Sequence, residues 1–225
     1  MCGRYSLAVY ASELALRFDF EGGEETLPPR FNIAPTQEVL AVTRNADDSR
    51  NAARGMRWGL IPFWAKDISI GNRMINARAE SIDTSPAFHR AFERRRCLVI
   101  ADGFYEWLKV GKDRVPMRIS LRSGEPFAFA GLWETWRSPD GEPVASCSII
   151  TTTANAVMEP IHSRMPVILP EYAESVWLDA AGARSAAELK ELLIPYAGTD
   201  LEVYEVSKLV NSPRNDTPEV MARVG

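Results

Sequence analysis

The sequence predicts an α+β fold in which a central, mainly antiparallel, barrel-like β-sheet core is flanked by helices. Strand-like segments fill the middle of the 225-residue chain, and helix-like segments lie nearer its ends. The two kinds do not alternate as a parallel βαβ fold requires. Hydrophobic residues make up 46% and charged residues 25%, as in ordinary globular proteins. We therefore expect a single domain over residues 1–225.

The first part of the chain predicts one helix and two strands. Residues 12–19 begin with a capping serine and show loose helical spacing of apolar side chains. Residues 21–36 contain two glycines and three prolines, so we expect mostly irregular structure there. Residues 37–44 and 54–60 alternate as strands do and are separated by a polar turn.

The middle of the chain is rich in strands, and helices return after it. Strands are predicted at residues 97–102, 104–110, 117–121, 127–136 and 146–152. Helices are expected at 171–180 and 185–193, the second because Ser185 and Glu188 match a capping box. A last strand at 201–206 precedes a polar tail.

Charge and cysteine content narrow the classes of function. The net charge of −4 argues mildly against a dedicated nucleic-acid module, although a few arginines can still form a local phosphate site. Cys2, Cys97 and Cys147 are too scattered for a metal cluster or a disulfide framework, and we interpret the last two as core residues. We expect no metal and no cofactor. Without a signal peptide or a long apolar stretch, we expect a cytoplasmic monomer that does not contact membranes.

Cys2 is the most informative single residue. A small residue at position 2 generally permits removal of Met1, which would leave an α-amine and a thiol on one residue. Unperturbed pKa values of about 8 for the amine and about 8.5 for the thiol would leave both partly deprotonated at neutral pH. Such a pair can serve in acyl transfer or condense with an aldehyde into a five-membered ring. The alternative, that Cys2 only begins a strand, stays open at this point.

Three further segments place polar groups where packing does not need them. In an extended segment, Asn76 and Arg78 point to one face and could hold a carbonyl or a phosphate. Glu106 shares a strand face with two apolar residues, so burial is expected to raise its pKa toward that of a general acid. His162 lies in a loop and could shuttle protons, and Arg164 beside it could bind an anion. Each could equally be an ordinary surface or edge residue.

Aromatic side chains give a weaker indication. Trp58, Phe63 and Trp64 occur among glycine and proline, so some of these rings could be exposed and stack on unpaired bases. Rings of this kind more often belong to a hydrophobic core. His89 instead fits a solvated helix face.

Taken together, these segments resemble the SOS-response-associated peptidase (SRAP) family, and they do so in order along nearly the whole chain. The matching runs are MCGRY (1–5), RFNIAPTQ (30–37), RWGLIPFWAKD (57–67), INARAES (75–81), RRCLVIADGFYEW (95–107), FAFAGLWE (127–134), TTTAN (151–155), IHSRMPVIL (161–169) and VSKLVNSPRNDTPE (206–219).

The resemblance implies a sensor of abasic sites in single-stranded DNA that forms a covalent thiazolidine crosslink and shields the lesion. It also implies removal of the chain's own Met1 and a weak strand-cleaving lyase activity. The protein would be associated with the bacterial nucleoid when bound to DNA. By resemblance the catalytic residues are Cys2, Asn76, Glu106 and His162. The residues expected to contact DNA are Arg4, Asn32, Trp64, Arg78 and Arg164.

Two other functions stay open at the level of sequence. Glutamine amidotransferases with an N-terminal nucleophile also begin Met-Cys-Gly, but here Arg4 and Tyr5 follow and no Asn-Gly oxyanion element is evident. A non-catalytic DNA-binding protein is the other alternative, and the acidic pI of 5.4 gives it little support.

Overall fold

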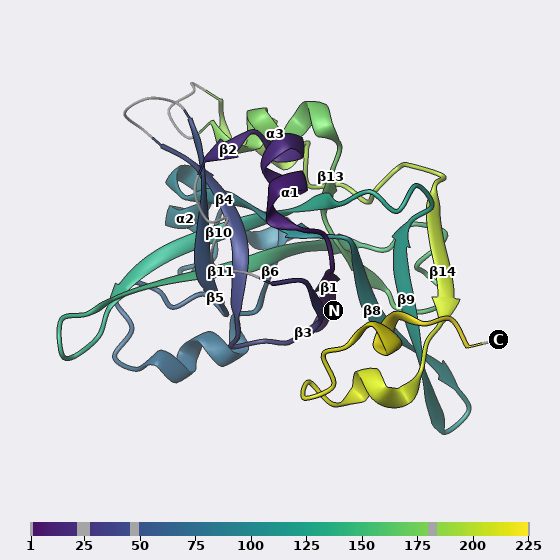
Figure 1. Cartoon of the computed structure of the whole chain (residues 1–225). Helices are drawn as coiled ribbons and strands as arrows, with labels where there is room; N and C mark the ends of the chain where they lie inside the picture. The colour runs from purple at the N-terminus through teal and green to yellow at the C-terminus, as the bar shows by residue number, and fades with distance from the viewer. Residues whose placement is uncertain (1, 22–27, 46–49, 180–183, 225) are drawn as a thin grey trace.

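The computed structural model describes residues 2–21, 28–45, 50–179 and 184–224 (Figure 1). Within these residues the strands form two sheets. The smaller sheet has the order β14-β9-β8-β1-β3. Its strands are β14 (Leu201–Glu205), β9 (Asp113–Leu121), β8 (Gly103–Val110), β1 (Tyr5–Leu7) and β3 (Arg30–Ile33).

The larger sheet has the order β12-β11-β10-β7-β4-β5-β2, with β13 paired to β10 and β6 paired to β11. Its strands are β12 (Arg164–Pro166), β11 (Pro143–Thr153), β10 (Phe127–Arg137), β7 (Arg96–Ala101), β4 (Glu38–Arg44), β5 (Asn51–Trp58), β2 (Phe20–Glu21), β13 (Ile168–Leu169) and β6 (Asn76–Arg78). Among the described strands, β2–β5, β5–β11 and β6–β11 pair in parallel, and the other pairs are antiparallel.

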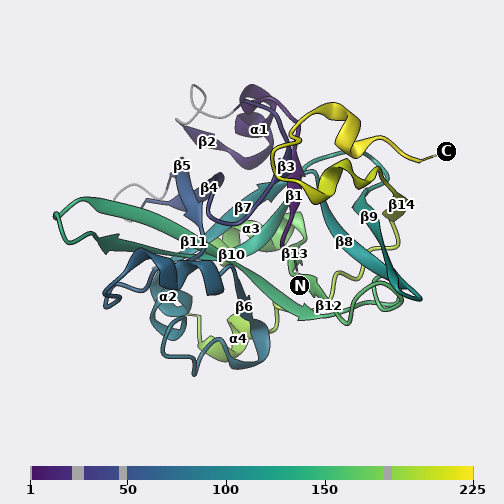
Figure 2. The same ribbon diagram turned by 90° about the horizontal axis from the view of Figure 1, so that it is seen from below.

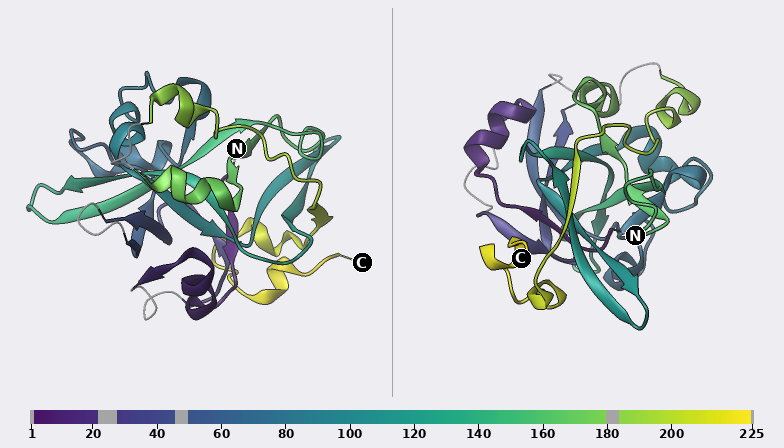
Figure 3. Two further views of the ribbon diagram at one scale, coloured as in Figure 1. Left: turned by 90° about the horizontal axis from the view of Figure 1, so that it is seen from above. Right: turned by 90° about the vertical axis from the view of Figure 1, so that its right-hand side faces the viewer.

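Helices lie outside this sheet core (Figures 1 and 3). They are α1 (Ala11–Phe18), α2 (His89–Arg94), α3 (Glu171–Leu178) and α4 (Ala186–Lys190), with short 3-10 helices η1 (Ile68–Arg73), η2 (Ala79–Ser81), η3 (Lys208–Asn211) and η4 (Pro218–Met221). The α+β class and the mainly antiparallel, barrel-like core are therefore confirmed.

Strand β1 lies in the middle of the molecule, between the strands of the two sheets (Figures 1 and 2). Its Tyr5 ring meets Trp58 at a centroid distance of 5.2 Å and Phe129 at 6.0 Å, both edge-on. Phe104 of β8 meets the same Phe129 ring edge-on at 6.0 Å. These contacts join the two sheets through one aromatic core, because edge-to-face rings pack closely without voids.

The predicted elements agree with the structure in most places. The helix expected at 185–193 is shorter, because α4 ends at Lys190. Residue 180 of the helix expected at 171–180 and most of the polar turn before β5 lie outside the described residues. The helix predicted at 12–19 is α1, but its N-cap is Tyr10, which makes no side-chain capping bond, and Ser12 is the second helical residue. Irregular structure was expected over 21–36, yet Arg30–Ile33 forms β3 beside β1. The physical reason is tertiary, because the Asp216 carboxylate accepts the backbone N–H groups of Phe31 and Asn32 at the other edge of this strand.

Other details of the prediction are confirmed. Cys97 and Cys147 are fully buried in the core. Ser185 and Glu188 form the predicted capping box at the start of α4. Among the residues described, no helix has the length and apolar character needed to cross a membrane.

Candidate active site at the N-terminus

The pairing of β1 with β8 brings the N-terminus beside Glu106. Tyr5 lies opposite Phe104 in antiparallel register, and the Tyr105 N–H donates to the Arg4 carbonyl at 2.9 Å. The residues that precede β1 therefore run alongside those that follow Phe104, toward Glu106. The Glu106 side chain is buried, and its charge acts on the Cys2 thiol. The predicted burial of Glu106 is confirmed.

Cys2 is fully buried and precedes the first strand rather than forming part of it. Its thiol donates a long hydrogen bond to the Arg4 carbonyl, with 3.9 Å between sulfur and oxygen. Burial, helped by the nearby Glu106 carboxylate, raises the pKa of the Cys2 thiol well above its ordinary value. The expectation of a partly ionised thiol concerned the chain after removal of Met1 and stays a prediction.

Asn76 holds the backbone at Cys2. It lies in β6, opposite Ile149 of β11 in parallel register, and its Nδ2 donates to the Cys2 carbonyl at 2.8 Å. The other end of the amide, Oδ1, is buried and accepts no hydrogen bond. Asn76 thus presents one unsatisfied acceptor close to Cys2, and a buried acceptor without a donor is costly.

Arg78 follows on the same strand and is exposed, whereas Ala77 between them is fully buried. This alternation confirms that Asn76 and Arg78 share one face. On that face, Arg78 is open to solvent and to an anion in solvent, and Asn76 is partly exposed.

His162 and Arg164 reach the same region through β11. Thr151 of β11 pairs with Arg78 on one side and with Pro166 of β12 on the other, so β6 and β12 flank this strand. The His162 ring Nδ1 lies 3.0 Å from the Arg164 backbone nitrogen and 3.2 Å from the Arg164 carbonyl oxygen. The catalytic role of His162 stays a prediction.

The Arg164 guanidinium is already engaged. It makes two hydrogen bonds to the Glu80 carboxylate, at 2.9 and 3.0 Å, and one to the Thr151 carbonyl at 2.6 Å. The ion pair holds the pKa of Glu80 below its usual range, with the Arg164 hydrogen bonds as the largest cause. A bidentate carboxylate has the geometry that a phosphate would adopt on the same arginine. A phosphate would therefore have to share Arg164 with Glu80.

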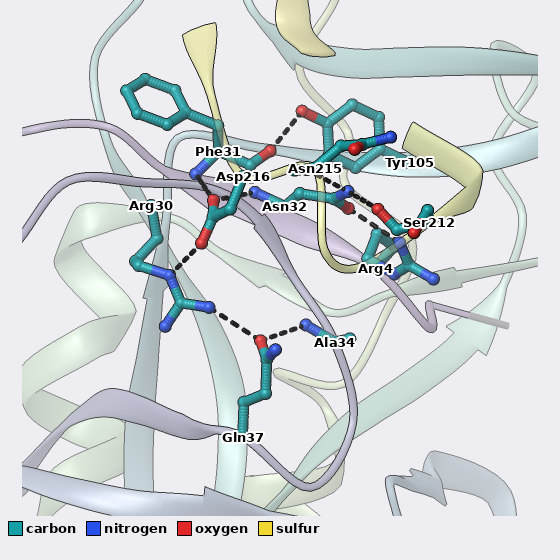
Figure 4. Close-up of polar contacts among 10 residues, drawn as sticks. All are labelled: Arg4, Arg30, Phe31, Asn32, Ala34, Gln37, Tyr105, Ser212, Asn215 and Asp216. Carbon is teal, nitrogen blue, oxygen red and sulfur yellow. Dashed lines mark hydrogen bonds and ion pairs between the residues drawn. The ribbon is translucent and has the colours of Figure 1, made fainter. Parts of the chain in front are cut away.

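Arg4 and Asn32 lie together beneath the C-terminal segment (Figure 4). Arg4 Nη1 donates to Asn32 Oδ1 at 2.8 Å and to the Val210 carbonyl at 2.7 Å. Partial burial lowers the pKa of Arg4. Asn32 is fully buried, and its amide nitrogen faces three backbone carbonyls. The predicted contact of Asn32 with DNA stays a prediction. In this structure its side chain makes hydrogen bonds to other parts of the protein.

Trp64 lies in the loop after β5. Trp64 and Phe63 are each 49% exposed, and the Arg90 guanidinium lies 4.6 Å from the Phe63 ring centroid. Trp58 of the same sequence run is fully buried. The run therefore contains one core ring, Trp58, and two exposed rings, Phe63 and Trp64.

Sequence reasoning missed Asp216 and Glu80 as supporting residues. Both lie within the runs that carry the family resemblance. For Asp216 the resemblance was the only indication, whereas Glu80 is also one of the polar residues that interrupt the apolar residues of its segment. In the part of the chain that the structure describes, no group of three or more His, Cys, Asp or Glu side chains is arranged to hold a metal ion.

Comparison with known proteins decides the family. The family model "SOS response associated peptidase (SRAP)" matches residues 1–213. The chain belongs to this family. The SRAP match thus covers Cys2, Asn76, Glu106 and His162, and it ends before Asp216.

Curated relatives and a solved structure agree with the SRAP assignment. The chain is 45% identical over 224 residues to the "Abasic site processing protein YoqW" of Bacillus subtilis, covering 98% of this chain and 99% of that protein. It is 32% identical over 270 residues to the "Abasic site processing protein HMCES" of Rattus norvegicus, covering 99% and 76%. A crystal structure of a protein from Bacteroides thetaiotaomicron superposes with a TM-score of 0.89 at 27% identity, covering 99% and 100%.

Proposed function

We propose that this SRAP-family chain processes abasic sites in single-stranded DNA by forming a covalent thiazolidine through Cys2 once Met1 has been removed. The observation that carries the proposal is the environment of Cys2. This residue is buried, its carbonyl accepts a hydrogen bond from Asn76, and its thiol experiences the charge of Glu106. Relatives that match nearly the full chain are named abasic site processing proteins, which supports DNA carrying such lesions as the substrate.

The chemistry needs an amine, a thiol and a proton donor. An abasic sugar is mostly a closed hemiacetal, and an acid that donates to the ring oxygen favours the open aldehyde. The α-amine of Cys2 adds to the C1′ carbonyl, and loss of one water molecule gives an iminium. The thiol sulfur then bonds to C1′, and its proton is released to a base. The products are one water and a five-membered ring that contains the Cys2 nitrogen and sulfur.

The order of the steps follows from the chemistry of the two groups. Only the amine can condense with the carbonyl and lose water to give an iminium, so we assign the first attack to the amine. Ring closure then requires a base to accept the thiol proton, and Glu106 and His162 are the groups available for this role. Closure is intramolecular, and well-oriented intramolecular reactions reach effective molarities of about 10⁵ M or more.

Asn76 and the arginines would orient the substrate. The unsatisfied Oδ1 of Asn76 suits an acceptor for the Cys2 amine or for a sugar hydroxyl. Arg4, Arg78 and Arg164 suit phosphates on either side of the lesion, because guanidinium groups bind phosphate oxygens as a fork. Trp64 is exposed enough to stack on an unpaired base.

Two side activities follow from the same groups. The iminium can undergo β-elimination before the ring closes, which would cleave the strand as a weak lyase. Removal of Met1 by the chain itself would use the Cys2 sulfur as nucleophile and Glu106 as its helper. Both belong to the proposal, and both require the residues already gathered around Cys2.

The decisive experiment uses uracil-containing single-stranded DNA after uracil excision. Wild-type protein is expected to give a heat-stable adduct in a denaturing gel, with a mass equal to protein plus DNA minus one water. Cys2→Ala should give none, because it removes the sulfur that closes the ring. Cys97→Ala is the matched control, since it removes another buried thiol and should leave the adduct unchanged. An undiminished adduct with Cys2→Ala, or none with wild type, would falsify the proposal.

Arg78→Ala tests the DNA path. We expect weaker binding of single-stranded DNA at all sequences and a salt slope smaller by about 0.7, the value for one lost phosphate contact on a single strand. Fluorescence anisotropy between 50 and 200 mM salt, a range of about fourfold, measures both quantities. Arg122→Ala removes an exposed arginine elsewhere and serves as the control. An equal slope for wild type and Arg78→Ala would mean that Arg78 is only solvated.

A further inference from the structure

The C-terminal segment is fastened to the strand that lies beside the N-terminus. The Asp216 carboxylate accepts the Phe31 N–H at 2.6 Å and the Asn32 N–H at 2.9 Å, and it pairs with the Arg30 guanidinium (Figure 4). The Tyr105 hydroxyl of β8 donates to the Phe31 carbonyl at 2.7 Å. Together these contacts fix the backbone of β3 at the position of Asn32.

Asn32 then fixes Arg4. Its amide nitrogen faces the carbonyls of Val210, Ser212 and Asn215 at 3.3, 2.9 and 2.7 Å, so its oxygen must face the other way. That oxygen accepts from Arg4 Nη1, which also donates to Val210. Both hydrogens of Nη1 thereby have acceptors inside the protein.

The rest of the Arg4 guanidinium is left for a ligand. Its Nε is buried without an acceptor, and Nη2 makes no hydrogen bond to any described residue. Arg4 is partly exposed, and its carbonyl accepts the hydrogen bond of the Cys2 thiol. A guanidinium that is pinned at one nitrogen and open at the other presents fixed donors close to the proposed nucleophile.

We infer that Asn32 and Asp216 are positioning residues, which aim Arg4 at a phosphate of the DNA strand next to the lesion. This inference rests on the proposed function for the identity of the ligand. Asn32 acts through Arg4 rather than by contacting DNA, because its side chain is fully buried and both ends of its amide hydrogen-bond within the protein. Preorganisation has a physical benefit here, since a flexible arginine would otherwise lose side-chain freedom when it binds.

A double-mutant cycle between Asn32 and Arg4 tests the inference. Undamaged single-stranded DNA is titrated into four proteins in a Cys2→Ala background: the parent, Arg4→Gln, Asn32→Ala and the double variant. We expect Arg4→Gln and Asn32→Ala each to lower affinity about threefold to tenfold and to reduce the salt slope by about 0.7. In the Arg4→Gln background, Asn32→Ala should have no further effect, because residues that act through one another are not additive.

Two further variants separate positioning from a loss of folding. Asn215→Ala removes a side-chain bond to the Leu209 carbonyl in the same segment and leaves the backbone contact with Asn32, so DNA affinity should not change. Asp216→Asn keeps the size of the side chain but loses its charge, and it should repeat the Asn32→Ala pattern more weakly. Thermal melting of every variant reports any general loss of stability.

Additive effects in the cycle would overturn the inference, as would unchanged binding in Arg4→Gln. Binding of undamaged DNA requires no covalent chemistry, so this result is independent of the crosslinking experiment. A missing crosslink with an intact Asn32–Arg4 coupling would reject the proposed chemistry alone. A normal crosslink with additive effects would reject the positioning role alone.

Discussion

Glu106→Gln is expected to slow crosslink formation by about 10²-fold or more, the typical contribution of a positioned general acid or base. Glutamine keeps the shape of the side chain and cannot exchange a proton. The residue is almost completely buried beside Cys2, so bulk water cannot easily take its place. Affinity for undamaged single-stranded DNA should be unchanged, because Glu106 carries no positive charge to bind phosphate.

Single-turnover kinetics in denaturing gels measure this effect across pH 5–8, at DNA concentrations that saturate the protein. The rate of Glu106→Gln should lie below that of wild-type protein at every pH in this range. Glu205→Gln, which changes an exposed glutamate of β14, is the control and should crosslink at the wild-type rate. Equal rates for wild type and Glu106→Gln would remove Glu106 from the chemistry.

The fold was largely predictable because its strands are encoded locally. β7, β8, β10 and β11 alternate or run apolar in the sequence, and turns of Gly, Pro and Asp separate the later ones. β3 was not predictable, since its partners are β1 and the side chain of Asp216, and Asp216 lies 184 to 186 residues away from the β3 residues that it contacts. A local pattern contains no record of such distant partners.

The same limit applies to the site. Each of Asn76, Glu106 and His162 had an equally good ordinary interpretation in its own segment, and only the pairing of strands brings Asn76 and Glu106 to Cys2. The complete burial of Cys2 was also not predictable, because residues from other elements cover it. The family resemblance supplied the grouping that residue patterns could not.

The second large effect concerns the buried ion pair that anchors β1. Asp102 precedes β8, and its carboxylate accepts the Ser6 hydroxyl at 2.6 Å and the Ala8 N–H at 2.5 Å. It also pairs with Arg118 at 3.0 Å, and both side chains are buried. A Cβ atom added to Gly103 would lie only 2.6 Å from the Arg118 guanidinium. The glycine in β8 therefore provides the space that the Arg118 side chain occupies in this pair.

Asp102→Ala should therefore lower the free energy of unfolding by about 3–5 kcal/mol, because it leaves the Arg118 charge buried without its partner. For a chain of this size, each kcal/mol corresponds to about 2–4 °C in Tm, so calorimetry should record a fall of roughly 10 °C. Glu21→Ala is the matched control, since its pair with Arg50 is exposed and worth about 0–1 kcal/mol. Asp102 accepts hydrogen bonds from Ser6 and Ala8. Its removal should therefore also weaken the attachment of β1, the strand that follows Cys2 and pairs with β8. Similar melting temperatures for Asp102→Ala and Glu21→Ala would show that the ion pair does not anchor β1.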